Sequence, residues 1–482
     1  MSFWRLLNIE VIPLIVASLA NLTFMLDTLR ASGFRPIGKL ATRHAREIES
    51  SPWSIGGETL DRDYAIYANY KAYLGPLGAK AIRLQGGWAK CEKVKGNYDF
   101  SWLSEVVNDA LSQGVQPWIQ LSYGNPIYPK GGEIGLRSPL PSSPEAIDAW
   151  KAWVRAIVRH FKDRVHEWEI WNEPDIGPNP PDTYAKFFLE TAQVVRSEQP
   201  DAKIYALALA NVGDAGLRYA KVLLDMAKEL HKLDLISAIT IHGYPHDPDD
   251  TAPVDRFRKL VANYSEKIEI RQGETGAPSS SDTYGALRGL YWSEVKQAKW
   301  NLRRMLAHYG KNVPFNLFTI CDLRYVDKDG KFVFNRKGLL LANDDMTVAR
   351  PKLAYFAAQR VFSIFDDTLK RIHEFEVVVT PSAPIFAVAY HKVKGALADR
   401  ANIVVMWLSN GPPKDEFEPV WVDLWLKNIG FKKPVLADLL TGEVYEIPHD
   451  RWSSDEKGAK FVRIPVYDSP IFLAEFGAIL EK

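Results

Sequence analysis

From about residue 52 to residue 366, short β-rich runs alternate with longer amphipathic stretches. This alternation is typical of βα units that build a parallel sheet. Eight units of about 35 to 40 residues fit a closed barrel better than an open sheet. A doubly wound sheet would need a glycine-rich phosphate turn after its first strand, and Gly56-Gly57-Glu58 is not one. The sequence therefore predicts an α/β fold, a (β/α)8 TIM barrel, with strands over residues 53–58, 79–86, 116–123, 165–172, 203–210, 238–244, 267–274 and 315–322.

The helices between these runs are recognised by apolar residues at three- and four-residue spacing. Residues 144–161 show this spacing at Ile147, Trp150, Val154, Ile157 and Val158. Ser143 precedes them as a good N-cap, and Pro144 suits the first helical position.

After about residue 370 the chain changes to strands without intervening helices. Turn signals such as Thr441-Gly442 separate these strands, which is typical of a small antiparallel β-sandwich. A chain of 482 residues exceeds the roughly 250 to 300 at which one core stops growing, so two units are expected. We assign the barrel to residues 52–369, the sandwich to 370–482, and residues 1–51 to a segment that packs on the barrel. The expected sandwich strands are 374–379, 385–391, 402–408, 420–426, 435–440, 460–466 and 471–475.

Basic and acidic side chains are almost balanced, since 60 Lys and Arg face 59 Asp and Glu and give a formal net charge of +1. No strong field is available to attract a phosphate backbone, so no nucleic acid partner is expected. Two cysteines, Cys91 and Cys321, make no disulfide framework and are expected to be free and buried. Fifteen tryptophans are many, and aromatic faces suit sugar rings, although most are expected in the core.

The N-terminus contains an apolar run over residues 11–25 with Arg5 before it, which resembles a signal peptide. Glu10 and Pro13 argue against that interpretation, and the run is too short to span a membrane. A cytoplasmic protein is expected, with secretion as the alternative.

Two glutamates end predicted barrel strands. The fourth strand runs into Trp171-Asn172-Glu173-Pro174, and the seventh into Gln272-Gly273-Glu274-Thr275. Barrel enzymes carry their chemistry at the carboxyl ends of the strands, so Glu173 and Glu274 are expected to face each other across the barrel mouth.

Cleavage of a glycosidic bond needs two carboxyl groups on opposite sides of the anomeric carbon. One protonates the leaving oxygen, and the other attacks the carbon or activates water. A separation of about 5 to 5.5 Å indicates double displacement with retention, and about 6.5 to 9.5 Å indicates inversion. The two glutamates therefore predict a glycosidase that needs no cofactor and acts on an oligosaccharide or simpler glycoside.

Trp-Asn-Glu-Pro after the fourth strand, with a second glutamate after the seventh, resembles the retaining barrel glycosidases of clan A, the 4/7 superfamily. Within that clan the chain resembles glycoside hydrolase family 39, the β-xylosidase and α-L-iduronidase family. The flanks of Glu274 differ from the Thr-Glu-Tyr/Trp context of that family, which leaves a divergent or neighbouring family open. This resemblance rests on the C-terminal β-sandwich and on three motifs. The motifs are Gly86-Gly87-Trp88-Ala89, Leu121-Ser122-Tyr123-Gly124-Asn125-Pro126 and Lys337-Gly338-Leu339-Leu340.

This resemblance implies retaining hydrolysis of a β-linked glycoside, with Glu173 as acid/base and Glu274 as nucleophile. It implies that Asn172 binds the sugar 2-hydroxyl, and that Arg83 and Tyr244 hold Glu274 ionised and oriented. A nearby guanidinium lowers a carboxylate pKa, whereas a general acid must stay protonated.

Further side chains are candidates for the sugar site. We expect His242 to be one of its hydrogen-bonding residues, because its spacing to His246 and Asp247 is not that of a helical zinc motif and no metal site is expected. Glu58 ends the first strand and either binds a substrate hydroxyl or serves in a cap or ion pair. Glu269 lies mid-strand on the face of Arg271 and is a weaker rival to Glu274. Four aromatic residues follow barrel strands and are candidate walls of the cleft: Trp88, Tyr123, Tyr128 and Trp292.

Three other functions remain open at this stage. The first is a catalytically silent barrel that binds carbohydrate, and the second is a metal-dependent hydrolase that uses His242 and a carboxylate. The third is transglycosylation, because a sugar hydroxyl can attack a glycosyl-enzyme ester as water does.

Overall fold

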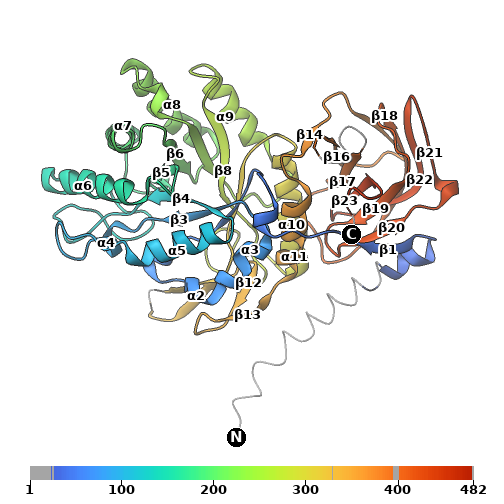
Figure 1. The fold of residues 1–482 in the computed structure, drawn as a ribbon, viewed down its shortest axis with the longest axis horizontal. Coiled ribbons are helices and arrows are strands. Elements are labelled where there is room, and N and C mark those ends of the chain that lie inside the picture. The colour runs from blue at the N-terminus through green and yellow to red at the C-terminus, as the bar shows by residue number, and fades with distance from the viewer. Residues whose placement is uncertain (1–22, 24–25, 328, 395–400, 480–482) are drawn as a thin grey trace, which may run out of the picture.

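The computed structural model of the chain describes residue 23 and residues 26–327, 329–394 and 401–479 (Figure 1). Eight parallel strands close into a barrel in sequence order, and the last strand pairs with the first. Every predicted barrel strand is present, with its ends moved by a few residues. The strands are β2 (Trp53–Gly56), β3 (Ala81–Gln85), β4 (Gln116–Leu121), β5 (Glu167–Ile170), β6 (Lys203–Leu209), β7 (Ala238–His242), β8 (Glu269–Thr275) and β9 (Phe315–Leu317).

Helices cover the outside of the barrel (Figure 1). Residues 144–161 form one of them with the predicted bounds, and the Ser143 side chain accepts a hydrogen bond from the backbone N–H of Ala146. The helices of this layer are α2 (Tyr67–Tyr70), α3 (Leu74–Leu77), α4 (Trp88–Cys91), α5 (Ser101–Ser112), α6 (Pro144–Phe161), α7 (Pro181–Glu198), α8 (Asp214–Glu229), α9 (Ala252–Ala262), α10 (Glu294–Tyr309) and α11 (Leu353–Ile364).

The barrel interior is filled by layers of side chains from alternate strands, as in other barrels of this type. The lowest layer joins β2, β4, β6 and β8 through Ser54, Trp118, Tyr205 and Arg271. The next layer comes from β3, β5 and β7 and is polar, because Arg83 bonds Glu169 and Glu169 bonds Thr240. A polar layer directly below the barrel mouth connects strands that are not neighbours in the sheet.

Two antiparallel sheets follow the barrel. The larger has the order β1-β20-β19-β23-β17-β16-β14 and the smaller β15-β18-β22-β21. All seven predicted strands are present, whereas the short strands β14, β20 and β21 were not predicted. The strands of the two sheets, apart from β1, are β14 (Leu369–Arg371), β15 (Glu376–Thr380), β16 (Ile385–Lys392), β17 (Asn402–Leu408), β18 (Val420–Lys427), β19 (Pro434–Asp438), β20 (Glu443–Glu446), β21 (Trp452–Asp455), β22 (Gly458–Val466) and β23 (Ile471–Glu475).

Two short hairpins lie between β9 and α11 and were also absent from the prediction. One pairs β10 (Leu323–Val326) with β11 (Phe332–Asn335), and the other pairs β12 (Leu340–Ala342) with β13 (Val348–Pro351).

The N-terminal region differs from the prediction that it packs on the barrel. Its strand β1 (Arg35–Lys39) pairs with β20 and so extends the larger sheet of the C-terminal domain, as the blue strand beside the red sheet in Figure 1 shows. The following residues do reach the barrel, since Arg46 donates to the backbone oxygen of Ser112 at the end of α5. Most of the apolar run over residues 11–25 lies outside the described residues. Within the described residues, no helix combines the length and apolar character needed to cross a bilayer.

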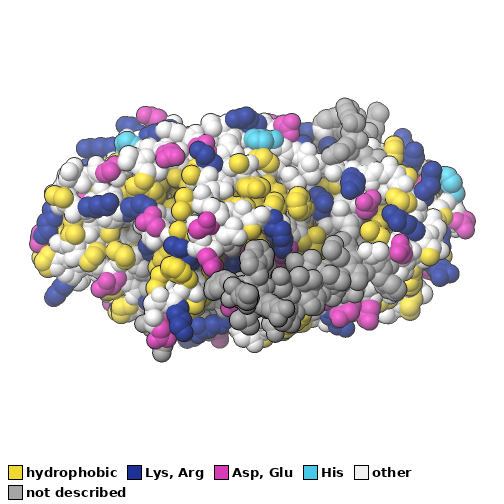
Figure 2. Space-filling model, turned by 90° about the horizontal axis from the view of Figure 1, so that it is seen from below, with side chains coloured by type: hydrophobic (Ala, Val, Ile, Leu, Met, Phe, Trp, Pro, Cys, Tyr) yellow, Lys and Arg dark blue, Asp and Glu magenta, His cyan; other side chains and the backbone are white. Residues whose placement is uncertain are grey.

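The remaining sequence expectations concern cysteine and charge. Cys91 and Cys321 are both free and buried, as expected. On the face drawn in Figure 2, basic and acidic side chains are interspersed, in keeping with the balanced composition.

Candidate active site

The backbone changes direction where β5 ends, and this change places Glu173. Strict alternation would put Glu169, Trp171 and Glu173 on one face of the strand. However, Trp171 and Glu173 have positive φ angles of 67° and 47°, which are uncommon outside glycine. Trp171 therefore packs outward against Trp150 of α6 and Phe187 of α7, while Asn172 turns inward to Arg83. Such conformations occur often at functional sites, where surrounding contacts maintain them.

Arg83 of β3 is the centre of the polar layer. Its Nε and Nη2 donate to Glu169 Oε2 at 2.9 and 2.6 Å, and Nη2 also donates to Asn172 at 2.9 Å. Its Nη1 donates to Glu58 Oε1 and to Glu274 Oε2, both at 3.0 Å. All five N–H groups of the guanidinium are thus engaged, and its side chain is fully buried.

Glu274 is held at the mouth by β8. The pairing register of β8 with its neighbours β7 and β9 shifts next to this residue. Besides Arg83, the hydroxyl of Tyr244 donates to Glu274 Oε1 at 2.6 Å. The alternative partner Arg271 lies in the lowest layer, where it stacks on Tyr205, and Glu269 is exposed at the start of β8. The structure therefore gives Glu274, and not Glu269, the position that faces Glu173.

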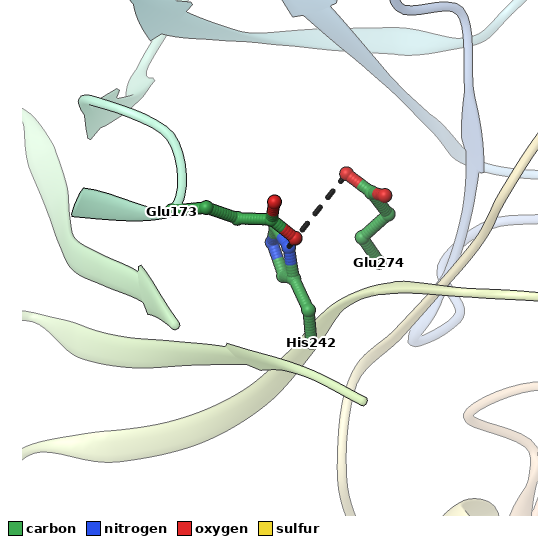
Figure 3. Close-up of side chains that lie close together, drawn as sticks. All are labelled: Glu173, His242 and Glu274. Atoms are coloured by element: carbon green, nitrogen blue, oxygen red, sulfur yellow. Dashed lines mark hydrogen bonds and ion pairs between the residues drawn. The ribbon is translucent and has the colours of Figure 1, made fainter. Parts of the chain in front are cut away.

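The carboxyl groups of Glu173 and Glu274 approach from opposite sides of the mouth, with the His242 ring beside them (Figure 3). An oxygen of each glutamate and a ring nitrogen of His242 all lie within 4.8 Å of one another. The nearest oxygens of the two glutamates are therefore no more than 4.8 Å apart, and the carboxyl groups lie close together at the mouth.

The surroundings drive the pKa values of the two glutamates in opposite directions. Burial and the negative charge of Glu274 raise the pKa of Glu173, although its hydrogen bond to His242 acts against this rise. Burial alone would raise the pKa of Glu274, but His242, Arg83 and the Tyr244 hydroxyl outweigh it and lower that pKa. The site thus favours a protonated Glu173 beside an ionised Glu274.

His242 contacts the carboxyl groups rather than an open sugar site. Its Nδ1 shares a hydrogen bond with Glu173 Oε1 at 2.9 Å and lies 3.7 Å from Glu274, and its Nε2 is buried with no partner among the described residues. Burial alone would lower the His242 pKa, but the charge of Glu274 and the bond to Glu173 raise it. His242 therefore contacts both glutamates, and its role as a sugar ligand stays a prediction.

A shared metal ion does not fit this group well. Nδ1 of His242 and Oε1 of Glu173 are joined by a hydrogen bond, and Glu274 already has the guanidinium of Arg83 as its cation. Of the other two residues of the metal hypothesis, His246 and Asp247, Asp247 forms an ion pair with Arg303. Nδ1 of His242 and the carboxyl oxygens that face it therefore already take part in hydrogen bonds within the protein.

Asn172 and Tyr123 lie beside the two glutamates. Asn172 Oδ1 accepts from Arg83 and Gln120, and its Nδ2 donates to the Tyr123 hydroxyl at 2.8 Å, which leaves one amide N–H for a ligand. Tyr123 also lines a cavity of about 310 Å³ together with Asp61, Arg62 and Lys90. Tyr123 thus connects this cavity to Asn172 through a hydrogen bond, while neither Asn172 nor the two glutamates line the cavity.

Three expected sugar platforms, Trp88, Tyr128 and Trp292, are core residues instead. Trp88 has no exposed surface, because its ring stacks on Tyr128 and Trp153 and its N–H bonds Glu92. Tyr128 is buried in the same cluster. Trp292 is 3% exposed and donates to the backbone oxygen of Leu287. Both tryptophans follow barrel strands, but the loops fold them inward, which spacing along the chain does not reveal.

Three further polar residues, Glu58, Glu169 and Lys337, lie at or near the site. Glu58 is 2% exposed and accepts a hydrogen bond from Arg83, so the structure places it against the guanidinium. Glu169 was not predicted as a site residue, although its inward position on β5 was readable from its alternation with Trp168. Lys337 was quoted only as part of a motif, yet its buried ammonium lies 5.4 Å from the centre of the Tyr244 ring. Burial lowers the Lys337 pKa to about 7, although the charge of Glu274 acts to raise it.

Comparisons with known proteins agree with this architecture. No family model matches the chain. Two curated plant proteins match parts of it at 26% identity: β-glucosidase 47 of Arabidopsis thaliana over 157 residues and β-glucosidase 11 of Oryza sativa subsp. japonica over 123 residues. These matches cover 28% and 24% of this chain, and only 28% and 22% of the relatives' own lengths.

Solved structures match over most of the chain. A family 39 glycoside hydrolase from Bacteroides cellulosilyticus WH2 has a TM-score of 0.64 at 18% identity, covering 92% of this chain and 83% of that one. A monomeric β-xylosidase from Caulobacter crescentus CB15 has a TM-score of 0.57 at 15% identity, with 91% and 97% covered. A family 30 subfamily 8 xylanase from Clostridium acetobutylicum has a TM-score of 0.53 at 14% identity, with 91% and 97% covered. The chain thus shares the fold of these glycoside hydrolases, a (β/α)8 barrel followed by a β-rich domain.

Proposed function

We propose that the protein is a retaining glycosidase that hydrolyses β-linked glycosides through a covalent glycosyl-enzyme. The observation that carries this proposal is the pair Glu173 and Glu274 at the barrel mouth, close together and with pKa values shifted apart. Two carboxyl groups with different protonation states are what double displacement requires.

In the first step the ionised Glu274 attacks the anomeric carbon, and Glu173 gives its proton to the leaving oxygen. Arg83 and Tyr244 hold the attacking oxygens in place and keep Glu274 ionised. Esterification of Glu274 then removes the negative charge that helps to raise the pKa of Glu173. Glu173 can therefore take a proton from water in the second step, in which water attacks the ester and the anomeric configuration is restored.

The names of the matched proteins suggest where to search for a substrate. They include β-glucosidases and a β-xylosidase, so aryl β-glucoside and β-xyloside head the panel, followed by β-galactoside and related sugars. We expect release of the aryl group from at least one of them, and a first-formed product with the β configuration in proton NMR. An α product would refute retention, and failure on the whole panel would favour a silent carbohydrate-binding barrel.

Two further measurements separate the remaining alternatives. Activity that persists after exhaustive chelation would exclude a metal-dependent hydrolase. Product analysis with an added sugar acceptor distinguishes hydrolysis from transglycosylation, because only transglycosylation joins the acceptor to the transferred sugar.

A further inference from the structure

Three carboxyl groups share the single positive charge of Arg83. Glu58 and Glu274 bind the same nitrogen, Nη1, and Glu169 binds Nε and Nη2. The side chains of Glu58, Glu169 and Glu274 are 2%, 0% and 14% exposed, so water can screen little of their repulsion. Three buried anions around one cation are strongly unfavourable, and a carboxyl group in such surroundings takes up a proton instead.

Hydrogen bonds identify which carboxyl group is least stabilised as an anion. Glu169 accepts four hydrogen bonds, two from Arg83 and one each from Gln120 and Thr240. Glu274 accepts short bonds from Arg83 and Tyr244. Glu58 Oε1 shares the Arg83 nitrogen and has only a 3.3 Å contact with Asn316 besides.

The other oxygen of Glu58 is buried and has no partner among the described residues. It lies against the backbone of Gly56, where an added Cβ would come within 2.1 Å of it. An unpartnered buried oxygen stabilises a negative charge poorly, because hydrogen bonds to the charged form are what favour it. Glu58 is therefore the member of the three that holds a proton.

We propose that Glu58 works as a neutral carboxylic acid, a positioning residue that shares Nη1 of Arg83 with Glu274 and leaves the charge of Arg83 to the nucleophile. This assignment rests on the proposed function for its effect on the reaction, but the protonation of Glu58 itself does not. The residue touches Arg83 and is only 2% exposed, so it acts through the guanidinium.

The titration of Glu58 agrees with this geometry. Burial raises its pKa, Arg83 acts against the rise, and the charge of Glu274 adds to it, with a result of about 7. The groups that face Glu58 come from several elements: Arg83 of β3, Glu274 of β8, Asn316 of β9, Tyr70 of α2, and Tyr244, which follows β7. Among these groups Arg83 is the one cation.

At alkaline pH Glu58 loses its proton, which adds a negative charge beside Glu274. Two anions would then lie on the two N–H groups of one nitrogen and repel each other, which weakens the bond that orients Glu274. We therefore expect kcat/KM to fall as Glu58 ionises above about pH 7, tenfold per pH unit for a single ionisation.

The kinetic test compares pH profiles of wild type and Glu58→Gln on an aryl glycoside with a good leaving group. Such a substrate needs no proton from Glu173. Lys337 and His242 titrate in both proteins, so the difference between the two alkaline limbs of kcat/KM reports Glu58. With each profile scaled to its own maximum, the wild type should fall above about pH 7 and the variant should not. Asp438→Asn is the matched control, because it removes another buried carboxyl with a raised pKa, in β19, and should retain the fall.

Two outcomes would overturn the proposal in this experiment. The first is the same alkaline fall in wild type and Glu58→Gln. The second is a variant with native circular dichroism that is inactive at every pH, because an amide of the same shape should replace a neutral acid.

A second readout does not depend on activity. A carboxyl group whose pKa is raised on folding contributes stability that is present below its unfolded pKa of about 4.3 and is lost as pH rises through the folded pKa. The melting temperature of wild type should therefore fall relative to that of Glu58→Gln between about pH 4.5 and pH 7. A constant difference across this range would overturn the proposal. If the difference shifts as expected but no glycoside is hydrolysed, the proposed function fails and the assignment of Glu58 stands.

Discussion

Glu173 and Glu274 carry the same functional group in different surroundings. Glu173 is buried beside another carboxyl group, whereas Glu274 accepts hydrogen bonds from Arg83 and Tyr244. One strand end therefore provides a proton donor and the other an anion. Mutations at these side chains should separate the two roles.

Glu173→Gln should reduce turnover of glycosides with poor leaving groups by about 10² to 10⁴-fold, because general acid catalysis typically contributes that much. Glycosylation by activated aryl glycosides should decrease far less, since they leave without a proton. The measurement is kcat/KM on one substrate of each kind. Glu167→Gln, at the opposite end of β5, is the control and should change neither value. Equal losses on both substrates would argue against Glu173 as the acid.

Tyr244→Phe removes the hydroxyl that donates to Glu274 at 2.6 Å. A hydrogen bond to a charged group contributes about 1.5 to 3 kcal/mol, so kcat/KM should fall roughly 10- to 100-fold. The pKa of Glu274 should also rise, and activity should therefore be lost at a higher pH on the acid side. Tyr467→Phe tests for general effects, because the buried Tyr467 hydroxyl has no partner among the described residues. An unchanged acid limb in Tyr244→Phe would contradict the assigned contact.

The sequence predicted some of these contacts and missed others for physical reasons. Arg83, Tyr244 and Glu274 were expected together because the resemblance to the clan A glycosidases implies it. Arg83 binds three carboxyl groups because they lie within reach of it across the barrel. Such distances cannot be read from residue spacing along the chain. Trp88 was misassigned because the same aromatic face suits a sugar and a neighbouring tryptophan.

Regular elements were predictable where their period was unbroken. The barrel strands and α6 follow from hydrophobic runs and helical spacing over many residues. The turn of the chain after β5 breaks the two-residue period of the strand. Asn172 therefore points into the barrel and Trp171 points outward, the reverse of what strict alternation predicts. The pairing of β1 with β20 joins residues about 400 apart, and nothing local in either strand indicates it.

Ser143→Ala tests the predicted start of α6. The Ser143 oxygen accepts the N–H of Ala146 at 3.1 Å, and loss of such a cap costs about 0.5 to 2 kcal/mol. The free energy of unfolding in urea should fall by that amount with kcat/KM unchanged. Ser143→Thr keeps the oxygen and should recover most of the loss, and equal losses in both variants would argue against capping.

At the scale of the whole molecule, α10 joins the barrel to the C-terminal domain. All its residues after Lys296 are buried, including Lys299 and Arg303. Lys299 donates to Asp468 at 2.7 Å and to two backbone oxygens of the loop before β18, and Arg303 donates to the backbone oxygen of Gly411. The two units therefore share buried charge across their contact.

Asp468→Asn leaves the Lys299 ammonium buried without its anion. Breaking a buried pair in this way costs about 3 to 5 kcal/mol, so the free energy of unfolding should fall by that amount. kcat/KM below the melting range should not change, because the pair is remote from the barrel mouth. Glu376→Gln breaks the exposed pair with Lys427 instead and should cost less than about 1 kcal/mol. Similar effects of the two variants would refute the importance of this contact.

The most direct test of the account is capture of the glycosyl-enzyme. A 2-deoxy-2-fluoro-β-glycosyl fluoride of the sugar found in the screen forms the ester faster than water breaks it. We predict that the intact mass increases by one fluoroglycosyl unit and that peptide mapping places this unit on Glu274, with no increase in Glu274→Gln. A unit on another residue, or turnover without any adduct and with inversion of configuration, would contradict the account.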